Sequence, residues 1–74
     1  MKQPTSVCIE EVRRFCEANE GFERRWGSSR RAFKTVRELW RHDEPDAPEA
    51  TMAYVRLRDA WRRLRRCARR LFAE

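Results

Sequence analysis

The last third of the chain constrains the fold most, because its apolar residues recur with a helical period. Small and apolar side chains follow one another at alternating spacings of three and four residues, at Ala50, Ala53, Leu57, Ala60, Leu64, Cys67 and Leu71. This period places them on one face of an α-helix, whereas a strand would alternate at every second residue. Pro48 suits the first turn of such a helix. The sequence therefore predicts one long helix over about residues 48–72.

A first, shorter helix is predicted over about residues 6–19. Thr5 or Ser6 is expected to cap its N-terminus, and Gly21 is expected to end it. The apolar side chains that share one face at helical spacing are Cys8, Ile9, Val12, Phe15 and Cys16. We expect this face to be buried.

A second helix is predicted over about residues 29–42, with Ser28 or Ser29 as its N-cap. Its apolar stripe consists of Ala32, Phe33, Val36, Leu39 and Trp40. Residues 43–48 contain two prolines and three acids, and this composition favours a turn that separates the second helix from the long one.

Together these elements predict an all-α fold, a single small three-helix domain over residues 1–74 with a long basic C-terminal helix. The small residues of the long helix leave room for large aromatic side chains to interdigitate with them, namely Phe15, Phe33, Trp40 and Trp61. At 1.5 Å per residue the long helix measures about 38 Å and each of the others about 21 Å. We therefore expect its C-terminal turns to project beyond the bundle.

The net charge of +6 resides in the long helix. Residues 1–49 hold ten basic and ten acidic residues, whereas residues 50–74 hold eight arginines and two acids. Those arginines are Arg56, Arg58, Arg62, Arg63, Arg65, Arg66, Arg69 and Arg70. Like charges three and four residues apart repel one another, and a plain solvated face usually mixes both signs. The pattern favours contact with the phosphates of a nucleic acid over a merely solvated face.

A second basic row is predicted on the second helix. Arg30, Lys34, Arg37 and Arg41 fall within about 60° of one another on a helical wheel. A helix that enters a DNA groove has such a row, but it also carries Asn, Gln or Ser to read base edges. The segment 20–28 is also longer than the turn of a helix-turn-helix. We therefore expect phosphate contacts rather than sequence-specific reading.

The cysteines and the single histidine do not predict a metal site. Cys8, Cys16, Cys67 and His42 show neither C-x-x-C nor H-x-x-x-H spacing. The cysteines all lie on apolar faces, where cysteine is an ordinary small core residue. We predict three free thiols in a reducing, cytoplasmic setting, with no metal and no cofactor.

Catalysis and membrane association are not expected either. The chain has no glycine-rich phosphate loop, and its histidine lies in the acidic turn without a Ser or Cys partner. The apolar stripe of the long helix has partners within the chain, and no uncharged run could span a bilayer. The sequence predicts a non-enzymatic protein without a small-molecule substrate.

One resemblance narrows the class of partner. The run Arg62-Arg63-Leu64-Arg65-Arg66, followed by Arg69-Arg70, in a small, basic, all-helical chain resembles the small phage proteins that bind bacterial RNA polymerase. The resemblance rests on size and charge layout. It implies a protein that binds the polymerase and alters initiation or termination near the RNA exit path. It also implies that the arginine face lies near RNA, and that a separate face docks on protein, formed by Val7, Glu11, Arg14 and Ala18.

The favoured hypothesis is a non-enzymatic regulator that docks on a nucleic-acid-handling complex, with bacterial RNA polymerase as the expected complex. DNA and RNA carry the same phosphates, so the sequence is compatible with either nucleic acid as the partner. A direct DNA-binding repressor is one alternative. A helical structural dimer, in which the long helix forms a coiled-coil seam, is another. The protein is expected to be a monomer or a dimer.

Overall fold

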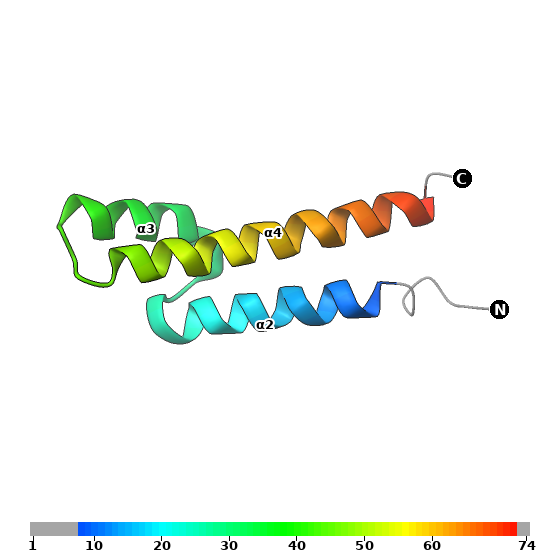
Figure 1. The fold of residues 1–74 in the computed structure, drawn as a ribbon, viewed down its shortest axis with the longest axis horizontal. Coiled ribbons are helices and arrows are strands. Elements are labelled where there is room, and N and C mark those ends of the chain that lie inside the picture. The colour runs from blue at the N-terminus through cyan, green and yellow to red at the C-terminus, as the bar shows by residue number, and fades with distance from the viewer. Residues whose placement is uncertain (1–7, 73–74) are drawn as a thin grey trace.

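The structure is a computed structural model that describes residues 8–72. Its α-helices are α2 (Ile9–Trp26), α3 (Ala32–Arg41) and α4 (Ala47–Phe72), and a 3-10 helix, η1 (Ser29–Arg31), precedes α3. Helices α2 and α4 lie side by side and antiparallel, while α3 covers only the first turns of α4 (Figure 1). The molecule is a rod of 52 × 20 × 16 Å. The predicted small all-α, three-helix domain is confirmed, and the part that the structure describes contains no strand.

Helix α2 is longer than predicted, because Gly21 lies inside it. The helix continues to Trp26 and ends at Gly27, whose φ of 92° is a conformation that favours glycine. A glycine within a helix costs about 1 kcal/mol relative to alanine. Continuing the helix brings Phe22 into the core, where its side chain is 0% exposed. Full burial of such a side chain contributes about 1.5–3 kcal/mol, which outweighs the cost of the glycine.

The face of α2 that meets α4 also differs from the predicted one. Ile9 and Val12, which were expected to be buried, are 56% and 42% exposed, and Cys16 is exposed as well. The inward face carries Cys8 and Phe15, as predicted, together with Ala18 and Phe22, which the prediction left out. Over a helix of 18 residues, these are the positions that stay on one side together. A helix assumed to stop before Gly21 lacks Phe22, and the predicted face is then rotated away from Ala18 toward Ile9 and Val12.

The start of α2 lies at Ile9, with Cys8 in the N-cap position and without a side-chain cap hydrogen bond. The predicted caps Thr5 and Ser6 lie outside the described residues. Ser28 occupies the N-cap position of η1, also without a side-chain cap hydrogen bond. Glu23 takes over that function, because its carboxylate accepts hydrogen bonds from the backbone N–H and the hydroxyl of Ser29.

The core is smaller than predicted. Its centre consists of Phe22, Ala32 and Leu57, against which Phe15, Ala18, Trp26, Val36, Ala53 and Tyr54 pack. Three of the aromatic side chains that were expected to interdigitate are largely exposed, Phe33 at 61%, Trp40 at 51% and Trp61 at 46%. A helix as short as α3, with 10 residues, presents one narrow stripe to the core. Ala32 and Val36 occupy this stripe, and the larger rings lie at its edge.

The end where α3 meets α4 is held together by hydrogen bonds. Asp43 adopts a positive φ of 50° directly after α3. The N–H of Asp43 donates to the carbonyl of Trp40, and that of Glu44 donates to the carbonyl of Leu39, which is a Schellman motif. The indole N–H groups of Trp26 and Trp40 donate to Asp46 and Thr51, both at 2.8 Å. The predicted acidic turn is thus confirmed as a closed, hydrogen-bonded connection.

The opposite end is joined by a disulfide between Cys8 and Cys67, with 6.1 Å between the two Cα atoms. The prediction of three free thiols is therefore wrong for these two residues, and Cys16 is the free cysteine. The predicted projection of the C-terminal turns is also wrong up to Cys67, because α2 accompanies α4 that far. Within residues 8–72, none of the helices has the length and apolar character needed to span a bilayer.

Candidate nucleic-acid interface

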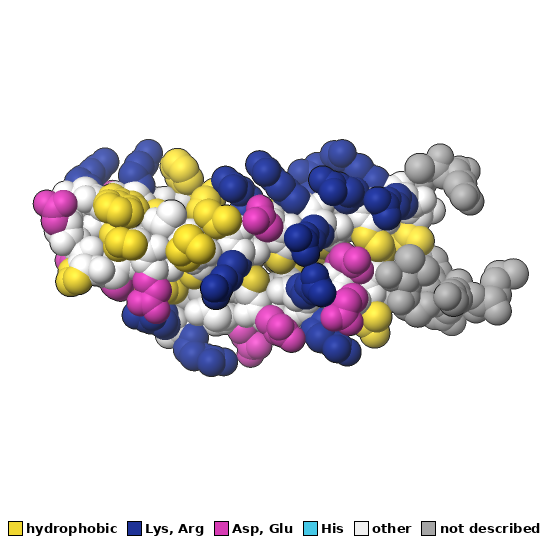
Figure 2. Space-filling model, viewed as in Figure 1, with side chains coloured by type: hydrophobic (Ala, Val, Ile, Leu, Met, Phe, Trp, Pro, Cys, Tyr) yellow, Lys and Arg dark blue, Asp and Glu magenta, His cyan; other side chains and the backbone are white. Residues whose placement is uncertain are grey.

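The eight arginines of α4 lie in rows on both flanks of its apolar stripe. Helical rotation places Arg63 two turns after Arg56, and Arg70 two turns later again, on the flank that borders α2. Arg58 and Arg65 have the same relation on the other flank. Together the rows cover α4 from residue 56 to residue 70, and all eight side chains are exposed. Figure 2 shows the basic side chains gathered over this half of α4.

A charged groove runs along the α2 flank of this helix. It consists of two adjoining hollows that share Arg14 and Arg63, with volumes of about 450 and 290 Å³. The charged side chains that line the groove come from both helices: Glu11, Arg14, Glu17, Arg56, Asp59, Arg63, Arg66 and Arg70. Five of these eight side chains are arginines, so the groove is positively charged overall.

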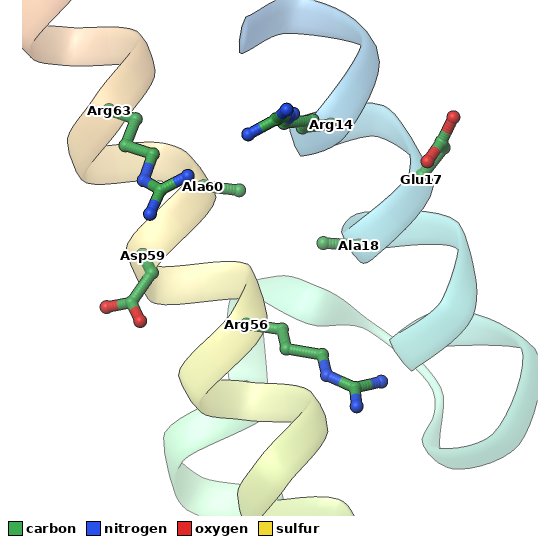
Figure 3. A pocket seen from close by; sticks show the side chains of 7 residues that line it. All are labelled: Arg14, Glu17, Ala18, Arg56, Asp59, Ala60 and Arg63. Atoms are coloured by element: carbon green, nitrogen blue, oxygen red, sulfur yellow. The ribbon is translucent and has the colours of Figure 1, made fainter.

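Small residues let the two helices approach each other at this groove. Ala18 and Ala60 face each other across the helix pair (Figure 3). Arg14 extends from α2 toward α4, and Arg56 extends from α4 toward α2. The Glu17 and Asp59 carboxylates point away from the gap between the helices. Guanidinium groups therefore extend across this part of the groove, and the Glu17 and Asp59 carboxylates do not lie between them.

The arginine face of α4 is not neutralised by acids within residues 8–72. Its single ion pair there joins Arg58 to the adjacent Asp59, at 4.0 Å. The remaining acids of the described chain that form ion pairs engage bases elsewhere, as Glu49 does with Arg25 and Glu38 with Arg41. Seven arginines of α4 consequently keep their hydrogen-bond donors available for an external anion.

The described residues of the predicted docking face, Glu11, Arg14 and Ala18, lie on one flank of α2, beside the arginine face of α4. Val7 lies outside the described residues. Ala18 packs against the core, while Glu11 and Arg14 line the charged groove together with Arg63. The predicted docking residues within the described chain thus adjoin the arginine face. Sequence reasoning missed Arg14 as part of that face, because the predicted buried face of α2 was rotated so that Arg14 lay on the side opposite to it.

One cluster near the disulfide has the composition of a metal site. The ligand atoms of Cys8, Glu11 and Cys67 lie within 4.8 Å of one another. Both sulfur atoms are engaged in the disulfide, so they do not provide the thiolates that a metal would need. The Oε1 atom of Glu11 is buried and has no hydrogen-bond partner among the described residues. His42, the other potential ligand, lies at the opposite end of the molecule and contacts Glu38.

The basic row predicted on the second helix, of which Arg30 lies in η1 and the others in α3, is exposed but partly engaged. Arg41 forms an ion pair with Glu38 at 3.3 Å, and the guanidinium of Arg37 lies over the Phe33 ring at 5.8 Å. Lys34 borders the same Glu38, whereas Arg30 lies near Arg58 of α4. This row therefore has a lower density of uncompensated positive charge than α4.

Comparison with known proteins does not assign the chain to a family. The chain matches no protein-family model, no curated protein and no solved structure.

Proposed function

We propose that this protein is a non-enzymatic regulator that binds nucleic acid through the arginine face of α4 and docks on a complex that handles nucleic acid. The observation that carries the proposal is the absence of internal neutralisation: within residues 8–72, seven of the eight arginines of α4 have no carboxylate within 4.0 Å. Binding a polyanion would replace the repulsion between these arginines with phosphate contacts and release counterions from the nucleic acid.

The charged groove supports the same proposal. Arg14, Arg56 and Arg63 come from two helices that the core and the disulfide hold together, so the backbone positions of these residues are fixed relative to one another. Arginines on a rigid pair of helices bind without the cost of ordering the backbone, which a flexible basic chain would incur. A phosphate backbone that follows α4 would meet these arginines in succession. The groove selects for charge and does not distinguish DNA from RNA.

The proposed complex is bacterial RNA polymerase, on the basis of size and charge layout. A pull-down from nuclease-treated bacterial lysate tests this part directly. We expect the polymerase subunits to be retained by the protein even after nucleic acid has been digested. Retention of neither polymerase nor any other nucleic-acid-handling complex would contradict the docking part of the proposal.

The nucleic-acid part is tested by fluorescence anisotropy with a labelled DNA or RNA duplex over a series of salt concentrations. If about half of the eight arginines contact phosphates, the slope of log affinity against log salt should be about −4. Reversing Arg62, Arg66 and Arg69 to Glu should weaken binding strongly and flatten the slope. Binding that does not depend on salt would contradict the proposal.

A control variant with the same change in net charge separates location from total charge. Arg13, Arg24 and Arg31 are exposed and lie outside α4. Reversing these three to Glu lowers the net charge equally but leaves the arginine face intact. We expect this variant to keep most of its affinity. Equal loss in both variants would show that only net charge matters and that no specific face is used.

Direct DNA binding as a repressor is a second candidate, because the connection from α2 to α3 is shorter than the sequence predicted. Only Gly27 and Ser28 separate α2 from η1. The whole connection from α2 to α3 is residues 27–31, five residues including η1, which is one more than the usual turn of a helix-turn-helix. The exposed row of α3 nevertheless lacks Asn, Gln or Ser side chains for base edges. Binding that depends on Lys34 and Arg37 and discriminates between duplex sequences would favour this candidate.

The cytoplasm is the proposed setting, and the disulfide makes this part of the proposal testable. Structural disulfides are rare in reducing compartments. Rapid alkylation of the protein in intact cells, followed by mass spectrometry, would count its free thiols. We expect Cys16 alkylated in every case. Alkylation of Cys8 and Cys67 would indicate a reducing compartment, and their protection would place the protein in an oxidising one.

A further inference from the structure

The other flank of the α2–α4 pair carries an aromatic groove with a volume of about 540 Å³, within the range of ligand clefts in proteins. Its walls are Phe15 and Asn19 of α2, Ser29 and Arg30 of η1, and Tyr54, Leu57, Arg58 and Trp61 of α4. The Phe15 and Trp61 rings face each other with centroids 5.3 Å apart. The charged groove has no comparable aromatic lining, so the two flanks differ in chemistry.

The apolar surface extends beyond the groove along α2. Val12 lies two turns before Asn19, so it shares the flank of the groove. Ile9 and Cys16 lie one turn to either side of Val12 on the same flank. These side chains are exposed, as is nearly half of Trp61. A contiguous apolar surface of this kind on a small protein marks an interaction site.

Helix α3 shows that an α-helix can pack on this side of the α2–α4 pair. At the other end of the rod, α3 packs on the α2–α4 pair through Ala32 and Val36. The Phe33 ring contacts Tyr54, which also lines the groove, at a centroid distance of 6.1 Å. The groove therefore begins where α3 begins and continues along α2 and α4, where no third helix from residues 8–72 covers it (Figure 1). From Asn19 back to Ile9 the length that no described helix covers is about 15 Å, or nearly three helical turns.

The rim on the α4 side is basic. Arg58 lines the groove, with its guanidinium 6.0 Å from the centroid of the Tyr54 ring. Arg62, Arg65 and Arg69 follow it at spacings of three and four residues, which keeps them on the same flank. Arg30 adds a further positive charge at the end nearest η1. Apolar walls with a basic rim on one side fit an apolar occupant that carries acidic side chains along one edge.

We propose that the aromatic groove binds an amphipathic α-helix of a partner protein, with its apolar face on Phe15, Leu57 and Trp61 and acidic side chains against Arg58 and its row. The partner helix would lie beyond α3, on the same side of the α2–α4 pair. This mode places side chains at i, i+3, i+4 and i+7 into an apolar groove. This inference rests on the proposed function in one respect: the aromatic groove would be the surface by which the protein docks on its partner complex. The row Arg58, Arg62, Arg65 and Arg69 would then serve both partners, whereas the arginines on the α2 flank, Arg56, Arg63, Arg66 and Arg70, would contact nucleic acid alone.

Labelled peptides of about four turns test the proposal by fluorescence anisotropy. The first has leucines at i, i+3, i+4 and i+7 and glutamates on its other face. The second replaces every glutamate with lysine, and the third scrambles the first so that no apolar face forms. We expect the first peptide to bind the full chain and the other two to bind at least about tenfold more weakly.

Two variants locate the binding surface, and one variant serves as the control. Trp61→Ala should weaken binding of the first peptide by at least about tenfold. Val12→Ser alters the apolar surface on α2 and should also weaken binding of the first peptide. This variant tests the proposal even if Trp61→Ala does not fold. Trp40→Ala removes an equally exposed tryptophan on α3, outside the groove, and should leave the affinity unchanged. Circular dichroism checks that each variant is helical.

Several outcomes would overturn the proposal. The first peptide could fail to bind, or the scrambled peptide could bind equally well, which would indicate charge attraction alone. A single-stranded oligonucleotide could compete with the peptide and depend on Trp61, which would make the occupant a nucleic acid. Sedimentation of the protein alone could show a dimer that Trp61→Ala dissociates, which would make it a second copy. Duplex binding by the arginine face is measured separately, so failure of one proposal does not imply failure of the other.

Discussion

The two flanks of the α2–α4 pair are built from the same two helices but offer opposite chemistry. The charged groove has Arg14, Arg56 and Arg63 above an alanine contact, whereas the aromatic groove has Phe15 and Trp61 ring to ring. The difference comes from residues a few positions apart on each helix, which rotation carries to opposite sides. A chain of this size can therefore present two distinct binding surfaces without a second domain.

The largest expected effect comes from the core residue on which both flanks depend. Phe22→Ala should lower the free energy of unfolding by about 3–5 kcal/mol, because the ring is fully buried. Trp61→Ala should cost roughly half of that, because nearly half of its side chain is already exposed. Urea denaturation followed by circular dichroism measures both. Equal losses of unfolding free energy in the two variants would mean that Trp61 belongs to the core. The aromatic groove would then not be a separate binding surface.

The disulfide should have the next largest effect, and it bears on the charged groove, which Cys67 also lines. It closes a loop with a sequence separation of 59 residues. Replacing Cys8 and Cys67 with serine should lower the free energy of unfolding by about 2–4 kcal/mol. Cys16→Ser is the matched control, because this thiol is exposed and unpaired, and it should change stability by less than about 0.5 kcal/mol. Denaturation with and without reductant measures the difference. Wild-type protein whose stability does not respond to reductant would contradict the disulfide.

The smallest expected effect separates stability from binding on the charged groove. Arg66→Glu places an acid four residues from both Arg62 and Arg70. Each such pair contributes about 0.2–0.5 kcal/mol, so the helix should become slightly more stable. Affinity for a nucleic-acid duplex should fall in the same variant, while peptide binding in the aromatic groove should change little. Thermal denaturation and the two anisotropy assays measure the three quantities. A loss of stability would mean that Arg66 is engaged within the fold.

The helices and the turn could be predicted from the sequence because their signals are local. The spacing of apolar residues defined α4 to within a residue at its start, and the two prolines with their acids defined the connection to α3. The end of α2 could not be predicted in this way. Gly21 is a local stop signal, and only the burial of Phe22 against Leu57 and Ala32 makes the longer helix favourable.

The candidate interface was predicted in composition but not in shape. The eight arginines of α4 could be identified from charge alone, and their exposure follows from the apolar stripe on the other side. The contribution of Arg14 and the aromatic groove could not be identified, because both depend on which side of α2 faces α4. The same error assigned Ile9 and Val12 to the core, although they lie on an exposed flank.

The sequence by itself determined the class of fold, the three helices and the concentration of positive charge on the last one, because each depends on neighbours within a few turns of one helix. The tertiary structure alone decided the rotation of α2 about its axis, the pairing of Cys8 with Cys67 and the separation of a charged from an aromatic groove. These features arise from contacts between residues about 40 to 60 positions apart. Such contacts are favourable only after the two long helices have packed together in one register.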